Sequence, residues 1–455
     1  MSQPKTPPPL SAKDPSSFAY PTMKDRIPVI LSKIVDHLTR NKLHITKEYG
    51  GEAAREELKA VIGAISELRH DVMTNKPAKP LRDSRHDAPL WNAQLEKQLN
   101  LKREEDEMHR TEQVKGEGLR WFDDAWLWME CYLYRRVQEA FLMCTLLKDF
   151  DVFAQQKQDA FKNAFQSTSH LTMYLQEVIN RFKEQVPEAE VKEYFVEFLQ
   201  VSLWGNKCDL SISAGQVQSH DHNPVIHLKV LKHKLLIDES DAVYQILRKV
   251  FDTKGKPAQV DIVLDNAGFE LVTDLCLAEF LITSGLASQI VFHAKSIPWF
   301  VSDVTLADWD WTLNTMSRMN HIAISELCER WRAYLEANTW TVELHDFWTM
   351  PNSYNEMHKV SPDLYACLSQ SDLILFKGDL NYRKLVSDRQ WDTTTKFESA
   401  LRGFHPAPLC SLRTLKCDCV VGLRSGQVQE AEEEDENWMI NGDWAIISTC
   451  EHRET

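Results

Sequence analysis

One largely apolar segment, residues 259–264, ends abruptly in a group of polar residues. It reads Gln-Val-Asp-Ile-Val-Leu and is followed by Asp265, Asn266, Gly268 and Glu270. Such a segment is typical of a strand that is buried on both faces of a parallel sheet. Open α/β sheets bind ligands at the carboxyl ends of their strands, so we expect Asp265 and Asn266 to lie at a functional edge.

The residues after this strand change to the spacing of a helix, which stops at Ser284–Gly285. Its apolar face consists of Leu271, Leu275, Ala278 and Ile282. The amino end of a helix presents unpaired N–H groups and a positive dipole end, which suits a phosphate beside Asp265. Oxygen ligands beside an anion site indicate Mg²⁺ or Mn²⁺ rather than zinc. For an isolated Asp-Asn pair, a helix N-cap is the simpler explanation. The metal hypothesis therefore depends on the strands that follow.

Two later strand-like segments end in related chemistry. Residues 289–295 lead to Asp303, and short right-handed crossovers return this carboxylate to the same sheet edge. Residues 372–376 lead to Lys377 and Gly378, which offer a cation and an accessible backbone to a phosphate. Three successive strand ends therefore predict a phosphate site beside a three-oxygen metal site, whose members are Asp265, Asn266 and Asp303.

These segments resemble one known family closely. The chain is similar to the metal-dependent damage-control phosphatases, long catalogued as a domain of unknown function, and in particular to their eukaryotic sugar-phosphate subfamily. Arg413, Thr414 and Lys416 form the Arg-Thr-x-Lys signature of that subfamily. The resemblance extends from about Tyr20 to near the C-terminus. The matching segments are Leu203–Ser211, Leu264–Glu270, Ser302–Val304, Phe376–Arg383 and Leu412–Lys416.

The resemblance implies a role for each matching residue. It makes Asp265, Asn266 and Asp303 the ligands of a divalent metal, Mn²⁺, Co²⁺, Ni²⁺ or Mg²⁺. It places Asn206 and Asp209 at the rim of the site, although anchoring of a buried loop is an equal alternative. Arg413 belongs to the signature itself. The residues that the resemblance places against the substrate are Asp265, Asn266, Glu270, Asp303, Lys377, Gly378, Asp379, Leu380, Asn381 and Lys416. The implied substrates are fructose 1-phosphate, fructose 6-phosphate or related phosphometabolites, hydrolysed as metabolite damage control.

The residue chemistry agrees with phosphate monoester hydrolysis. That reaction needs neutralised phosphoryl oxygens, a positioned nucleophile and a stabilised leaving oxygen. Asp265 and Asp303 are the catalytic candidates at the metal, and Glu270 or Asp303 is the candidate to orient water. A mechanism with an Asp nucleophile usually places a second Asp two residues later as general acid. Here that residue is Ala267, so direct attack by water is favoured.

Composition limits the class of protein. The chain has 455 residues and a formal net charge of −15, which argues against a nucleic-acid surface. No segment predicts a signal peptide or a membrane span. Ten cysteines without a Cys-x-x-Cys pair indicate reduced structural thiols. We therefore expect a protein of the cytoplasm, or also of the nucleus, that binds neither nucleic acid nor membrane and acts on a small sugar phosphate.

The pattern along the chain predicts three regions. Residues 1–18 are rich in Pro and Ser and are expected to be disordered. Residues 19–190 predict a helical bundle domain with aromatic residues in its core. Residues 191–455 predict the α/β phosphatase domain, a mostly parallel, Rossmann-like sheet between helices. Within it, the acidic stretch 430–436 is expected to be a mobile loop.

Two alternatives from other classes stay open. The first is an S-adenosylmethionine-dependent protein-glutamate O-methyltransferase, an activity associated with members of the family that this chain resembles. A nucleotide fold of that kind needs a glycine-rich turn after its first strand, and residues 265–268 are a poor version of one. The second is a binding protein without catalysis, which intact Asp265, Asn266 and Asp303 argue against.

Overall fold

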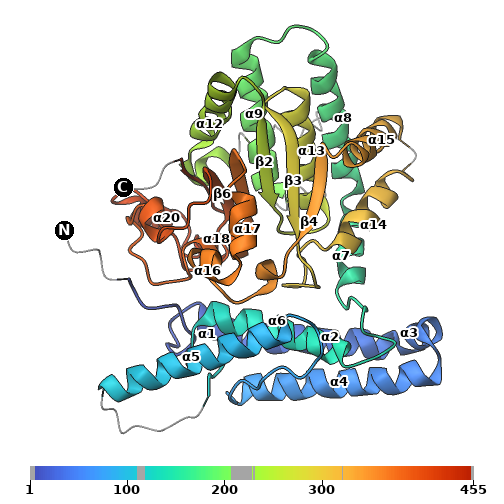
Figure 1. Cartoon of the computed structure of the whole chain (residues 1–455), viewed down its shortest axis with the longest axis vertical. Coiled ribbons are helices and arrows are strands. Elements are labelled where there is room, and N and C mark those ends of the chain that lie inside the picture. The colour runs from blue at the N-terminus through green and yellow to red at the C-terminus, as the bar shows by residue number, and fades with distance from the viewer. Residues whose placement is uncertain (1–5, 110–117, 206–227, 229–230, 320, 452–455) are drawn as a thin grey trace. The chain divides into compact units, whose positions relative to one another are not determined.

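The computed structural model describes residues 6–109, 118–205, 228, 231–319 and 321–451 (Figure 1). The chain divides into two compact units. The first contains Met1–Val152, Ile297–Phe300 and Thr349–Pro351. The second contains Phe153–Ser296, Val301–Trp348 and Asn352–Thr455. None of the described helices is both long and apolar enough to cross a membrane.

The described part of the second unit contains a seven-stranded sheet in the order β1-β7-β6-β5-β2-β3-β4. Neighbouring strands are parallel except for β6 and β7, which pair antiparallel. The predicted α/β class with a mostly parallel sheet is therefore confirmed. The strands are β1 (Leu235–Asp238), β2 (Ala258–Val263), β3 (Ala287–Ala294), β4 (Trp340–Leu344), β5 (Leu373–Lys377), β6 (Leu409–Thr414) and β7 (Ala445–Cys450).

Helices flank this sheet (Figure 1). Alternate residues of β2 and β3 point into a core shared with helices, which is the arrangement expected of strands with a side-chain period of two. The helices that contribute to this core are α7 (Ala154–Asn163), α8 (Phe165–Arg181), α9 (Glu188–Leu203), α12 (Ser240–Lys254), α13 (Phe269–Thr283), α14 (Leu306–Met316) and α15 (Ile322–Glu336). The remaining elements of the unit are short: η2 (Lys232–Lys234), η3 (Asp346–Thr349), η4 (Tyr354–Glu356), α16 (Met357–Val360), α17 (Pro362–Leu368), α18 (Gly378–Leu385), α19 (Phe397–Ala400) and α20 (Gln427–Glu434).

Helix α13 follows directly from the first ligand loop and is buried on all sides. Its expected apolar face is present, but its acidic residues are buried too. Glu279 accepts a hydrogen bond from the Trp331 indole at 2.9 Å and pairs with Arg330 at 3.0 Å. Asp274 pairs with Lys377 at 2.6 Å. Buried charges need partners. The acidic residues that interrupt the apolar pattern of α13 are therefore the ones that pair with other charged or polar side chains in the centre of the unit.

The first unit is helical, as expected. Its helices are α1 (Ala19–Pro21), α2 (Ile27–Arg40), α3 (Lys42–Tyr49), α4 (Glu52–Met73), α5 (Ala88–His109) and α6 (Trp126–Leu142), with a π-helical turn over Thr22–Arg26. Helix α6 is buried along almost its whole length. Trp128 stacks on Tyr132 with their ring centroids 5.5 Å apart. The aromatic residues of this segment therefore form the core of the bundle, as aromatic stripes usually do.

Two boundaries differ from the sequence expectation. The division between the units falls after Val152, whereas the helical domain was expected to extend to residue 190. The reason is that α8 and α9 pack against α13 and belong to the core of the sheet unit. Residues 6–18 were expected to be disordered, but Leu10 is buried and its carbonyl accepts a hydrogen bond from the Trp126 N–H at 2.8 Å.

The acidic stretch 430–436 was expected to be a mobile loop, and this expectation is wrong. Most of the stretch lies in helix α20, whose residue Ala431 is buried. The helix is held at its far end by Lys234, whose ammonium pairs with Glu434 at 2.6 Å. The positive charge of Lys234 thus offsets part of the repulsion among the acidic side chains of this stretch.

Candidate active site

The three ligand loops meet at one edge of the sheet because their strands are neighbours. β2 lies between β5 and β3, and Val263 is in register with both His293 and Phe376. Asn266 and Asp303 form an isolated β-bridge. The order of the strands therefore brings the loops after β2, β3 and β5 together, as predicted.

Backbone hydrogen bonds hold the first two loops together. The Val304 N–H donates to the Asp265 carbonyl at 2.8 Å, and the Ala267 N–H donates to the Ser302 carbonyl at 2.8 Å. Asp303 therefore lies beside Asp265 and Asn266, although it is 37 residues beyond Asn266 in sequence. The positions of these three residues follow from the backbone ladder and do not depend on a bound ligand.

The side chain of Asn266 links two carboxylates. Its Nδ2 donates to Asp265 Oδ2 at 2.6 Å and to Glu270 Oε2 at 2.8 Å. The Ser302 hydroxyl donates to Asn266 Oδ1 at 2.5 Å. A hydroxyl can donate or accept, so Ser302 is a suitable partner for either end of the amide. The carboxylates of Asp265 and Glu270 lie on either side of the Asn266 Nδ2 group. The space between these two carboxylates therefore favours a positively charged group.

The carboxylates of this cluster are buried close to one another. Asp265 is 7% exposed, and burial together with the charges of Glu270 and Asp303 raises the pKa of Asp265 well above its usual range. Burial also raises the pKa of Asp303 to about 6, against the opposing charge of Lys295. The Lys295 ammonium lies 3.4 Å from Asp303 Oδ2 and donates to the Leu264 carbonyl at 2.8 Å. Mutual repulsion of buried carboxylates is relieved by a bound cation.

The donor set consists of two carboxylates and one amide, which are the hard oxygen ligands that Mg²⁺ and Mn²⁺ accept. In the described residues, no three His, Cys, Asp or Glu side chains form a complete metal cage. The third candidate ligand is the Asn266 amide, which would bind a cation through Oδ1, the atom that accepts from Ser302 in this structure. The buried negative charge and the oxygen chemistry fit a divalent cation at Asp265, Asn266 and Asp303.

Gly378 brings the third loop against this cluster. It is the first residue of α18 and has φ +82°, a conformation that L residues rarely adopt. A Cβ built there would lie 1.9 Å from Asp265 Oδ2. Only glycine allows the amino end of α18 to approach the Asp265 carboxylate this closely. The expected accessible backbone at residue 378 is therefore next to the metal-ligand candidate.

Lys377 occupies a different place from the expected one against a phosphate. It is 1% exposed, and its ammonium donates to Asp274 Oδ1 at 2.6 Å and to the Ser202 carbonyl at 2.7 Å. Glu270 Oε1 lies 3.6 Å away. Burial alone lowers the pKa of Lys377, but the charges of Asp274 and Glu270 outweigh it and raise that pKa. Lys377 therefore holds Glu270 and Asp274 in place, with its hydrogens directed at protein groups.

The signature segment contributes one buried and one exposed cation. Arg413 is fully buried, pairs with Asp379 at 2.8 Å and has its guanidinium carbon 4.1 Å from the ring centre of Tyr382. Although burial raises the pKa of Asp379, Arg413 holds it below its usual value. Lys416 is exposed, and its backbone N–H donates to Asp379 Oδ1 at 3.2 Å. The positive charge of Lys416 opposes the rise in the pKa of Asp265 that burial and the neighbouring carboxylates cause.

The remaining predicted residues fall into two groups. Leu380 and Asn381 are buried in α18, and the Asn381 side chain is hydrogen-bonded to protein groups. Asn206 and Asp209 lie outside the described residues. Gly205, just before them, packs against Glu270, whose Cα would be 3.1 Å from a Cβ at that position. The segment that contains Asn206 therefore starts next to a residue of the cluster.

Sequence reasoning missed three residues that position this cluster: Lys295, Ser302 and Asp274. Lys295 follows the last residue of β3, where strand-end chemistry was expected, so its place in the pattern offered a signal. Asp274 is one helical turn after Glu270, which puts both on the same face of α13. Ser302 lies in a segment that matches the family, although no role was assigned to it there.

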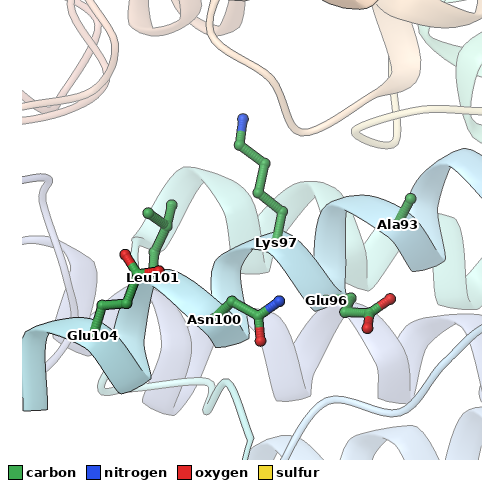
Figure 2. A pocket seen from close by; sticks show the side chains of 6 residues that line it. All are labelled: Ala93, Glu96, Lys97, Asn100, Leu101 and Glu104. Carbon is green, nitrogen blue, oxygen red and sulfur yellow. The ribbon is translucent and has the colours of Figure 1, made fainter. Parts of the chain in front are cut away.

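The first unit has a surface hollow along α5, lined by Ala93, Glu96, Lys97, Asn100, Leu101 and Glu104. Figure 2 shows these side chains on one face of the helix. Lys97 and the two glutamates mix both signs of charge, and Leu101 is exposed. The hollow contains none of the predicted site residues and has no buried polar group. It is a feature of an exposed helix surface.

Buried carboxylates, an amide and lysines gather at the strand ends of this α/β sheet, the edge at which open α/β sheets bind their ligands. The chain belongs to the damage-control phosphatase ARMT1-like domain family, whose model matches residues 22–431. It is 46% identical over 449 residues to damage-control phosphatase ARMT1 of Danio rerio, covering 98% of this chain and 97% of the relative. It is 43% identical over 440 residues to damage-control phosphatase ARMT1 of Homo sapiens, covering 96% and 97%.

A solved structure of a DUF89 family protein from Pyrococcus horikoshii also matches. It aligns with a TM-score of 0.44 and 14% sequence identity, over 95% of this chain and 98% of that one. The predicted resemblance to the damage-control phosphatases is confirmed by the family match. The relatives bear the name of phosphatases, and this does not favour the methyltransferase alternative.

Proposed function

We propose that the protein is a metal-dependent phosphatase that hydrolyses sugar phosphate monoesters, such as fructose 1-phosphate or fructose 6-phosphate, as metabolite damage control. The observation that carries this proposal is the cluster at the strand ends. Asn266 bridges Asp265 and Glu270 there, and Asp303 is bridged to Asn266. The phosphatase name of the family supports the same reaction class.

Asp265, Asn266 and Asp303 would hold the divalent cation, which we expect to be Mn²⁺, Co²⁺, Ni²⁺ or Mg²⁺. When bound, such an ion neutralises negative charge on the phosphoryl oxygens. The burial of Asp265 and Asp303 strengthens electrostatic interactions inside the site.

Glu270 is the residue that we assign to the attacking water. Asn266 and Lys377 hold its carboxylate on two sides, at 2.8 Å and 3.6 Å, so its orientation is set before substrate arrives. Glu270 accepts a proton from the water as the water oxygen bonds to phosphorus and the bond from phosphorus to the sugar oxygen breaks. The sugar oxygen takes up one proton, which balances the one that water loses. The products are the free sugar and inorganic phosphate.

Lys416 is the cation that we assign to the substrate phosphate. It is exposed, and in the described part of the chain its ammonium has no ion-pair partner, unlike Lys377. Its positive charge opposes the rise in the pKa of Asp265, which supports a role for Lys416 beside the cluster. Arg413 acts indirectly, because it pairs with Asp379, and Asp379 in turn accepts the N–H of Lys416.

The test is a phosphate-release assay of purified protein with a panel of sugar phosphates, with each divalent cation or with EDTA. We expect activity only with a cation, and none in Asp265→Ala. Asp372→Ala is the matched control, because Asp372 is also 7% exposed and lies at the opposite end of a strand, paired with Lys254. That variant should lose stability and keep metal-dependent turnover per folded molecule.

Full turnover by Asp265→Ala in EDTA would contradict the metal assignment. Melting curves provide an independent check, because a ligand that binds only the folded state raises the melting temperature. We expect a rise with Mn²⁺ and a further rise with a hexose phosphate. A large metal-independent rise with S-adenosylmethionine, and none with phosphate compounds, would favour the methyltransferase instead.

A further inference from the structure

The Asn381 side chain ties together the ends of two neighbouring strands. It lies on α18, and its Nδ2 donates to the Lys377 carbonyl at 2.7 Å. Longer contacts reach the carbonyls of Val263 at 3.3 Å and Leu264 at 3.5 Å. Lys377 ends β5, Val263 ends β2, and Leu264 is the residue after it. One buried amide therefore connects the backbone just before Gly378 with the backbone just before Asp265.

A tyrosine holds the oxygen of that amide. The Tyr354 hydroxyl donates to Asn381 Oδ1 at 2.5 Å. The two ends of an amide have nearly the same shape, and only the hydrogen-bond partners distinguish them. The three carbonyls only accept, so they require Nδ2 on their side, and Oδ1 is then the atom that the Tyr354 hydroxyl holds. The reverse orientation would direct an oxygen at three other oxygens.

Tyr354 itself is held firmly. It is 1% exposed, and its ring centre lies 5.3 Å from that of Phe376 and 5.5 Å from that of Phe404. Phe376 belongs to β5, so the tyrosine is packed on the strand whose end its hydroxyl helps to position. Aromatic packing fixes the ring, and the ring fixes the hydroxyl.

The strand ends need this precision because of the contact between Gly378 and Asp265. A Cβ at residue 378 would lie inside the Asp265 carboxylate, so small displacements of either strand change this approach. The Leu264 carbonyl also accepts from Lys295 at 2.8 Å, and Lys295 lies next to Asp303. The residue before Asp265 is thus held from two sides.

We propose that Tyr354 is a positioning residue for the metal and phosphate site, acting through Asn381. It holds the β2 and β5 ends so that Asp265 and the amino end of α18 keep their mutual geometry. Asn381 then acts by supporting the backbone of the site, which differs from the direct substrate contact implied by the family resemblance. The inference rests on the proposed function for its activity readout, while metal affinity provides a readout without turnover.

The test compares Tyr354→Phe with Tyr132→Phe. Tyr132 is a matched control in the helical unit, because it is 2% exposed and its hydroxyl donates to the Lys79 carbonyl at 2.5 Å. Both variants keep the ring and lose one buried hydroxyl. The Tyr132 hydroxyl also accepts from the Lys79 N–H at 2.8 Å and from Arg136 Nη1 at 2.9 Å, so we expect Tyr132→Phe to lower the melting temperature at least as much as Tyr354→Phe. Only Tyr354→Phe should lower the affinity for Mn²⁺, measured by calorimetry, and kcat. Loss of a supporting hydrogen bond at a metal site typically costs about 10-fold to 100-fold, and we expect at least the lower figure, with KM changed little.

A double-mutant cycle with Asn381→Ala separates this path from general loosening. If Tyr354 acts through Asn381, the double variant should bind Mn²⁺ about as weakly as Asn381→Ala alone. Additive losses, or a Tyr354→Phe variant with wild-type metal affinity and kcat, would overturn the proposal. Wild-type protein that neither binds a divalent cation nor releases phosphate would overturn both this proposal and the proposed function. Active wild type with an unchanged Tyr354→Phe variant would overturn this one alone.

Discussion

Replacing Gly378 by alanine should damage the site through two separate costs. The first is conformational, because φ is +82° and an L residue in the left-handed region costs about 1–2 kcal/mol. The second is steric. The new Cβ would lie 1.9 Å from Asp265 Oδ2, 2.2 Å from its Cγ and 2.8 Å from its Cβ. The carboxylate or α18 must shift, and overpacking of this kind typically costs about 1–3 kcal/mol. We expect a total loss of about 2–5 kcal/mol.

Gly255→Ala is the control that isolates the conformational cost. Gly255 has φ +63° at the end of α12, and no atom lies within 4 Å of the position of its Cβ. Denaturant unfolding should therefore show a loss of only about 1–2 kcal/mol. Phosphate release and Mn²⁺ affinity should stay at the wild-type level in Gly255→Ala and fall sharply in Gly378→Ala. Equal stability losses in the two variants, with full activity in both, would refute the close approach of Gly378 to Asp265.

Four further outcomes follow from the burial, charge or backbone conformation of single residues. Asp265→Asn should raise the melting temperature of the metal-free protein, because repulsion in the cluster falls, and should abolish the rise caused by Mn²⁺; a retained rise would contradict the ligand assignment. Lys416→Ala should lower kcat/KM at least about tenfold at unchanged stability, since a charged hydrogen bond contributes about 1.5–3 kcal/mol. Lys377→Ala should instead cost about 3–5 kcal/mol in unfolding free energy, because Asp274 is left buried without its partner; equal stability of the two lysine variants would contradict this distinction. Val301→Gly should stabilise the protein by up to about 1 kcal/mol in the same assay, since a β-branched residue stands there at φ +70° at a cost of about 1–2 kcal/mol, of which the conformational entropy of glycine offsets about 0.5–1 kcal/mol, and a net loss would show that this strain is absent.

The meeting of Asp265, Asn266 and Asp303 was predictable from sequence, because the carboxyl ends of neighbouring parallel strands share an edge. The orientation of Lys377 was not. It depends on Asp274, 103 residues earlier, and on the Ser202 carbonyl, 175 residues earlier. A strand-end lysine looks available to a ligand until the helices that pack around it are known. Asn381 raises the same difficulty, because its role depends on Tyr354, which lies outside every motif considered.

The expectations drawn from composition alone were weaker. A segment rich in Pro and Ser was expected to be disordered. Its residue Leu10 is buried, however, and the Leu10 carbonyl accepts a hydrogen bond from the backbone N–H of Trp126. An acidic run was expected to be a loop, yet Lys234 supplies a countercharge to its helix. In each case one residue distant in sequence decides the local structure. Composition averages over a segment and does not register such single partners.

The charges of the cluster explain why a divalent ion suits this site. Its members, linked by hydrogen bonds and ion pairs, are the carboxylates of Asp265, Glu270, Asp274 and Asp303, the amide of Asn266, and the ammonium groups of Lys295 and Lys377. With all groups ionised, four negative and two positive charges leave two negative charges unbalanced. Burying such an excess costs free energy, and the raised pKa values of Asp265 and Asp303 report that cost. An ion of charge +2 would bring the buried cluster to neutrality. A negatively charged phosphate could then bind beside Lys416 without net repulsion from the carboxylates.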